Sequence, residues 1–181
     1  MNSFIKISLI IMSLVISISP QSDEEILWGE KAIEWEDFKG MPPENYNTTM
    51  GAYTTTKIKT EYFSSKDRVQ KTKVYCYFNQ NKSWALLNDD YSLAHERLHF
   101  DIAEIYARKI RKAFDSLATN EITEMSKYSE VFKLYDNLLG AYNHEYDSNV
   151  YGNKQKQAEW SEKIKNELKA LEEYEYLPFN D

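Results

Sequence analysis

The residues best suited to chemistry lie in one short stretch, His95-Glu96-Arg97-Leu98-His99, which holds two of the three histidines of the chain. On a helix, a step of four residues turns by about 400°, so the two imidazoles would point the same way, one turn apart. Two imidazoles so placed can ligate one zinc ion, and Glu96 beside them could accept a proton from a metal-bound water. The stretch therefore predicts a zinc site that activates water for hydrolysis.

The spacing matches the H-E-x-x-H pattern of zinc metalloproteases, a pattern that also arises by chance. In the chance case the two histidines lie on the solvated face of a helix, in a helical interaction module that binds no zinc. Against this, His95 and His99 share a stripe with Ile102, Tyr106 and Ile110, which is the face expected to be buried. Buried imidazoles need polar partners, and a metal ion supplies one.

A catalytic zinc also needs a third protein ligand and an open position. Glu104 lies nine residues after His95 and about 180° around the helix, so we expect it to face away as a solvated or structural carboxylate. The end of the next predicted helix is the best source, because an antiparallel neighbour returns to the start of the first helix. Four residues there can ligate: His144, Glu145, Asp147 and Tyr151.

The elements that would position these residues are a strand hairpin and three helices. Residues 52–63 and 68–78 are rich in threonine, β-branched and aromatic residues and predict an antiparallel β-hairpin, with Cys76 as a buried small residue. The first helix is expected from Ser92 to a break at residues 119–120, and the second from Met125 to near Asp147. A third helix follows the break at residues 152–153. The pattern predicts an α+β fold, with a small antiparallel sheet before three long helices and a zincin-like metal site on the first.

Composition limits the location and the partners. Residues 7–18 are almost wholly apolar and follow Lys6, which is typical of a secretory signal peptide and too short for a spanning helix. We expect residues 1–21 to be the signal peptide, cleaved between about Ser19 and Ser22, and residues 22–181 to form one secreted or periplasmic domain with no stable membrane span. An uncleaved anchor is the alternative.

The charge balance argues against nucleic acid as a partner, since 29 acidic residues outnumber 22 basic ones and the net charge is −7. The single cysteine, Cys76, allows no internal disulfide, so packing or a metal must hold an exported domain together.

Several segments taken together resemble a known family. They are EWEDFKGMPP, NKSW, LAHERLHFDIAEIYARKIR, YDSNVYG and KQAEWSEKI, and they span about Trp35 to Leu168. They resemble the predicted secreted zinc-dependent proteases grouped as domain-of-unknown-function family 922. The resemblance implies a zincin-like fold, Zn²⁺ as cofactor and a peptide or protein substrate.

The second family motif bears on the third ligand. It resembles Tyr-Asp-x-x-Thr-x-His; Tyr146 and Asp147 match it, whereas Tyr151 stands near the family histidine. The layout is also similar to the aspzincins, in which a ligating aspartate is followed closely by Tyr-Gly. These resemblances imply Asp147 as the third zinc ligand and Tyr151 as the group that stabilises the oxyanion. His144, Glu145 and Tyr151 remain alternative ligands.

The sequence as a whole predicts an exported zinc metallohydrolase, most simply a peptidase. His95, His99 and Asp147 would hold the zinc, Glu96 would act as general base, and Tyr151 would assist it. The alternative is a non-catalytic envelope binding or scaffold protein with a structural or vestigial zinc site. The departure from the family pattern at Tyr151 keeps that alternative open.

Overall fold

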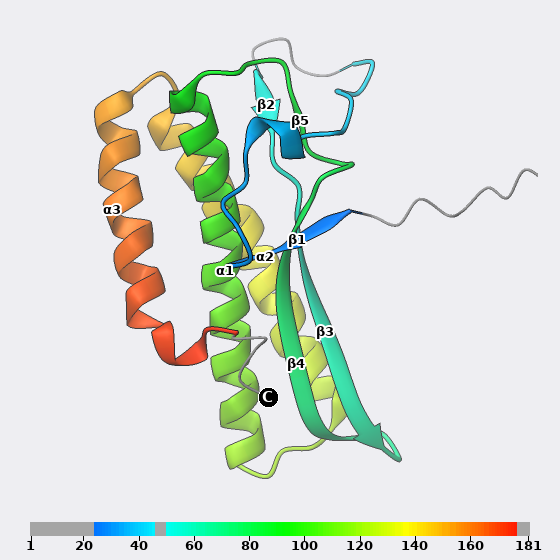
Figure 1. The fold of residues 1–181 in the computed structure, drawn as a ribbon. Helices are drawn as coiled ribbons and strands as arrows, with labels where there is room; N and C mark the ends of the chain where they lie inside the picture. The colour runs from blue at the N-terminus through cyan, green and yellow to red at the C-terminus, as the bar shows by residue number, and fades with distance from the viewer. Residues whose placement is uncertain (1–23, 46–49, 177–181) are drawn as a thin grey trace, which may run out of the picture.

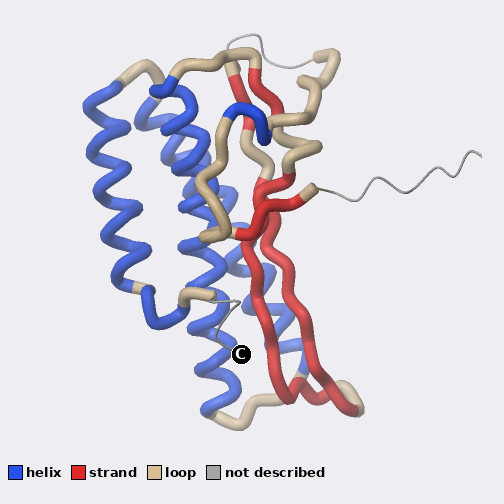
Figure 2. The backbone as a smooth tube through the Cα atoms, viewed as in Figure 1, coloured by secondary structure: helices blue, strands red, loops and turns tan. Residues whose placement is uncertain are grey.

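The computed structural model describes residues 24–45 and 50–176. Helices form one side of the molecule and strands the other (Figure 2), and α1 runs between the sheet and the outer helix α3 (Figure 1). The predicted α+β fold, with a small antiparallel sheet before three long helices, is confirmed. The predicted signal peptide, residues 1–21, lies outside the described residues.

Two small sheets make up the strand side. β1 (Glu25–Leu27), β4 (Arg68–Asn79) and β3 (Thr56–Ser65) form an antiparallel sheet in that order, and β2 (Ala52–Tyr53) pairs separately with β5 (Trp84–Ala85). The prediction of one strand over residues 52–63 was therefore wrong. The chain bends at Thr54 and Thr55 because the hydroxyl of Thr54 donates to the carbonyl of Glu96, while the hydroxyl of Thr55 donates to the carbonyl of Lys82.

The three predicted helices are confirmed, and their ends follow local signals. α1 spans Asp90–Thr119, α2 Met125–Val150 and α3 Lys154–Ala170; two short 3₁₀ helices, η1 (Trp35–Asp37) and η2 (Glu172–Tyr174), flank the set. The side chains of Asp89 and Asn153 accept backbone hydrogen bonds at the starts of α1 and α3. α2 continues one turn beyond the end predicted near Asp147, which places Asp147 inside its last turn.

The core lies on both sides of α1. On one side Phe100, Ala103 and Ala107 pack against the sheet, where Cys76 is fully buried as predicted. On the other side Ile102 and Ile105 pack against α2 and α3. Because α1 is enclosed in this way, the position of its first turns is fixed by the sheet and by both other helices.

Glu104 is buried, not solvated. It is 1% exposed and pairs with Arg108 and Arg111; Arg108 also pairs with Glu175, and we call these four residues the Glu104 cluster. The expectation of a solvated Glu104 was wrong and the structural alternative was right. The face of α1 opposite His95 is covered by the end of α3 and the segment after it. Arg108 donates to the carbonyl of Leu168 and Arg111 to that of Tyr174.

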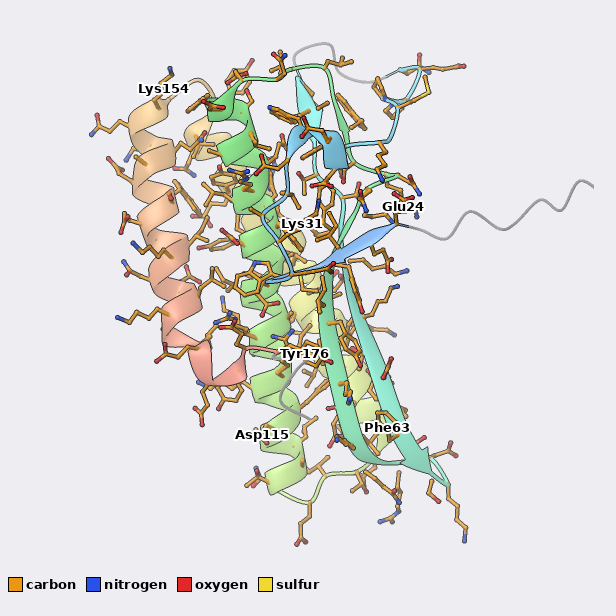
Figure 3. The ribbon with its side chains drawn as sticks, viewed as in Figure 1. Glu24, Lys31, Phe63, Asp115, Lys154 and Tyr176 are labelled. Atoms are coloured by element: carbon orange, nitrogen blue, oxygen red, sulfur yellow. The ribbon has the colours of Figure 1, made fainter. Side chains whose placement is uncertain are left out.

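The ends of several elements meet at one end of the molecule. The start of α1, the end of α2, the start of α3 and the β2–β5 pair all lie at the top of Figure 1. Figure 3 labels Lys154 at this end, and Phe63 and Asp115 toward the opposite one. None of the described helices has the length and apolar character that crossing a membrane requires.

Candidate metal centre

Two neighbouring helices bring three ligand-type side chains together at this end. His95 and His99 lie near the start of α1, and Asp147 lies in the last turn of α2. The two Nε2 atoms are 3.1 Å apart, and Asp147 Oδ1 is 3.3 Å from that of His95 and 3.0 Å from that of His99. We call His95, His99 and Asp147 the His-His-Asp cluster. Among the described residues, it is where side chains of metal-ligand type converge.

The spacing of these three atoms fits a tetrahedral zinc ion. Bonds of about 2.0–2.1 Å in tetrahedral geometry hold ligand atoms about 3.3 Å apart. The observed separations of 3.0, 3.1 and 3.3 Å are close to that value. Two imidazoles and a carboxylate also leave a fourth position for water or substrate, as catalytic zinc sites require. Both the donor types and their spacing fit zinc.

Asn143 determines which nitrogen of His99 can bind a cation. Its Oδ1 lies 2.8 Å from Nδ1 of His99, and because an amide oxygen can only accept, Nδ1 carries the hydrogen and donates this hydrogen bond. Neutral His99 then presents an unprotonated Nε2 to Asp147 and His95. In this state the lone pairs of His99 Nε2 and Asp147 Oδ1 face each other, and the one hydrogen that can lie between the three atoms is on Nε2 of His95. A cation would relieve this repulsion, and metal-binding histidines are commonly oriented by such a hydrogen bond.

Without a metal, a proton on His99 Nε2 can take the place of the cation and pair this ring with the carboxylate of Asp147. Burial lowers the pKa of His99, but its hydrogen bond to Asp147 and the charge of that carboxylate outweigh burial and leave the pKa raised. Burial raises the pKa of Asp147, yet hydrogen bonds from His95 and His99 outweigh it and hold the pKa well below its ordinary value. A proton and a metal ion would therefore compete for the same imidazole nitrogen.

The ring of Tyr146 packs against both imidazoles. It stacks on His95, with 4.8 Å between centroids and 20° between planes, and meets His99 edge to face at 5.1 Å. It is fully buried and also packs against Trp160 of α3. The candidate ligands are thus oriented by core packing as well as by hydrogen bonds.

Glu96 is a buried carboxylate with an unused oxygen. It is 5% exposed, and its Oε2 has no hydrogen-bond partner among the described residues. Leaving a buried polar atom without a partner is costly. Glu96 lines the same cleft as the His-His-Asp cluster, so water or substrate in the cleft can serve as that partner.

The cluster opens into a cleft of about 390 Å³. Its walls come from residues 50–54, the start of α1, the end of α2 and the start of α3. Small-molecule sites have volumes of this order. A substrate can therefore reach the ligand-type atoms and Glu96 from outside the protein.

The other residues predicted for the site have different positions. Tyr151 follows the last residue of α2 and lines the cleft with a side chain that is 77% exposed. His144 and Glu145 are exposed on α2, outside both the cluster and the cleft lining. Of the four candidates for the third ligand, Asp147 is the one whose carboxylate meets the two histidines.

Sequence reasoning missed Asn143 and the cleft wall. Asn143 lies four residues before Asp147 and so on the same face of α2, and this spacing is a signal that could have found it. No comparable pattern links residues 50–54 to a helix some forty residues later. Their position depends on the bend after β2.

Comparison of the chain with protein-family models, with curated proteins and with solved structures gives no match. The resemblance to the secreted protease family therefore stays a prediction, and the geometry of the cluster and its cleft carries the functional argument.

Proposed function

We propose that this protein is an exported zinc-dependent hydrolase that cleaves amide bonds, most simply in peptides. The observation that carries the proposal is the convergence of His95 Nε2, His99 Nε2 and Asp147 Oδ1 at zinc-ligand spacing. Beside them in the same cleft, Glu96 has a buried oxygen that no residue of 24–45 or 50–176 partners.

Zinc held by these three side chains would supply a Lewis acid and a water of lowered pKa. Glu96 would accept a proton from the attacking water at Oε2 and then deliver it to the leaving amine. Asn143 would keep His99 in the tautomer that binds through Nε2, and Tyr146 would hold both rings. Tyr151, at the mouth of the cleft, would donate a hydrogen bond to the oxygen on which charge develops.

The test combines metal content with hydrolysis for the wild type, Glu96→Gln and the control Glu145→Gln. Metal content is measured by elemental analysis of dialysed protein, and hydrolysis by peptide release from denatured casein. We expect one zinc per chain in all three proteins. We also expect hydrolysis by the wild type and by Glu145→Gln, and a loss of at least about a hundredfold in Glu96→Gln.

Two outcomes would overturn the proposal. Full hydrolysis by zinc-loaded Glu96→Gln would remove Glu96 as the base. One zinc per wild-type chain without hydrolysis of casein or of simple peptides would instead favour the scaffold protein with a structural zinc.

A further inference from the structure

The cleft wall facing the His-His-Asp cluster is unusually apolar for an exposed surface. Four of the large apolar side chains that remain exposed line this one cleft: Met50, Tyr53, Leu87 and Tyr151. Leu86, next to Leu87, is exposed as well. Exposed apolar side chains that gather in a concave site are typical of ligand-binding surfaces, whereas scattered ones are ordinary.

Leu87 packs against the backbone of Gly51 although it is 47% exposed. A Cβ atom at Gly51 would lie 2.0 Å from Cδ1 and 2.5 Å from Cγ of Leu87, so this side chain rests directly on the glycine backbone. The amide of Leu86 donates to the carbonyl of Gly51 at 2.7 Å, which fixes the two segments against each other. This part of the wall is therefore formed by the protein's own contacts before a ligand binds.

The charged side chains that line the cleft limit which peptide side chains it can bind. Apart from the two histidines, the charged side chains among the described lining residues are the carboxylates of Glu96 and Asp147; no lysine or arginine is among them. An acidic side chain would find no cationic side chain on the described walls, and the zinc ion of the proposed site would be its one counter-charge there. A neutral apolar side chain would instead cover Leu87 and its neighbours and exclude water from them.

We propose that the cleft selects peptide segments that carry a large apolar side chain beside the bond to be cleaved, and that Leu87 is the residue that determines this preference. The proposal rests on the proposed hydrolase function, since it names the substrate class of the same site. It places the apolar side chain against Leu87 and Met50, with the peptide backbone next to the His-His-Asp cluster.

Binding is measured so that catalysis does not enter. Zinc-loaded Glu96→Gln is titrated with four acetylated, amidated, dye-labelled repeat peptides, built from Ser-Gly-Leu, Ser-Gly-Ser, Ser-Gly-Asp and Ser-Gly-Lys, and Kd is read from fluorescence anisotropy. Because the repeat offers its side chain in every register, the subsite need not be known. We expect the leucine peptide to bind about tenfold or more tightly than the serine peptide, and more tightly than either charged peptide.

Three further variants in the same background assign the preference to the wall. Leu87→Ser should remove most of the leucine-over-serine preference and leave the serine peptide unchanged. Gly51→Ala should act in the same direction, because the new methyl displaces Leu87. Leu134→Ser is the matched control: Leu134 is 55% exposed on α2, outside the cleft lining, so its loss should change nothing.

Equal affinities for the leucine and serine peptides would overturn the proposal, and so would a preference that survives Leu87→Ser. The outcome is separable from that of the proposed function. A leucine preference in Glu96→Gln, beside a wild-type protein that hydrolyses nothing, supports the cleft proposal and rejects the hydrolase. Hydrolysis without any side-chain preference supports the hydrolase and rejects the cleft proposal.

Discussion

Helix α1 carries two clusters of charged or ligand-type side chains, and they are built in opposite ways. In the Glu104 cluster, Glu104 Oε1 accepts from Arg108 Nε at 3.0 Å and from Arg111 Nη1 at 2.8 Å. In the His-His-Asp cluster, three ligand-type atoms face one another, and neighbouring Glu96 keeps an oxygen without a partner among the described residues. The carboxylate of the Glu104 cluster is paired with arginines of the protein itself, whereas the His-His-Asp cluster faces a cleft.

Whether its polar atoms are all paired within the protein distinguishes a cluster that stabilises the fold from one that can bind a ligand. Buried ion pairs are common, and removing one partner is costly because the other stays buried without a counter-charge. A site for a ligand instead leaves a buried donor or acceptor without a protein partner, next to a cleft that a ligand can enter. The same helix thus offers an internal control for the candidate site, and four experiments test whether the two clusters really differ in kind.

The largest effect should come from Asp147→Ala. Loss of the third ligand should weaken zinc binding by roughly a thousandfold, or about 4 kcal/mol, because two imidazoles alone do not complete a zinc site. Competition with a chelating dye measures the affinity. His144→Ala, three residues away and outside the cluster, should bind zinc as the wild type does. If His144→Ala weakens zinc binding and Asp147→Ala does not, His144 is the third ligand.

Next in size is Glu104→Gln. Removing the charge between Arg108 and Arg111 should lower the free energy of unfolding by about 3 kcal/mol, as measured by urea denaturation. Zinc affinity of the folded protein should stay unchanged. Glu130→Gln, which breaks an exposed pair with Lys127, should cost less than about 1 kcal/mol. A loss of zinc in folded Glu104→Gln would mean that the two clusters are not independent.

A smaller effect is expected for Asn143→Ala. Without the acceptor for its Nδ1–H, His99 can take the other tautomer, in which Nε2 is protonated and cannot ligate. Zinc affinity should fall about 10- to 100-fold. Asn143→Asp keeps an acceptor and should restore most of the affinity. If Asn143→Ala binds zinc normally, packing by Tyr146 alone orients the ring.

The most gradual effect, about tenfold for each pH unit, is a dependence of zinc binding on pH. In the metal-free protein the raised pKa of His99 stabilises the fold below the unfolded value of 6.5, and this stability is lost as pH rises through the folded value. The lowered pKa of Asp147 gives stability above its unfolded value of 3.8, which is lost only as pH falls through the folded value. The metal-free cluster is therefore most favoured between these two unfolded values.

Zinc needs the unprotonated imidazole and so gains as pH rises. We expect zinc affinity to increase about tenfold per pH unit for each proton displaced, from roughly pH 6 until His99 has lost its proton. The rise in Tm on adding zinc, followed by calorimetry, should grow over the same interval. Equal zinc-induced shifts at the two ends of that interval would contradict the proton competition at His99.

Local patterns predicted the parts of the molecule that depend on neighbours along the chain. The apolar stripes gave the three helices, and the four-residue step placed His95 and His99 on one face. The antiparallel course of α2 brought Asp147 back to them. What failed depends on distant partners: the bend at Thr54 needs the carbonyl of Glu96, and burial of Glu104 needs a segment that begins after α3. The cleft wall was missed for the same reason.

Arg108 joins parts of the chain that are synthesised far apart. Its guanidinium lies over the ring of Trp28 at 4.9 Å, donates to the carbonyl of Leu168 at 2.8 Å and pairs with Glu175 at 2.9 Å. Contacts between residues so distant in sequence slow folding, because the loop must close before the contact is gained. Until residue 175 has been synthesised, Arg108 lacks one of these three partners, so the buried charge cannot be fully paired before that point.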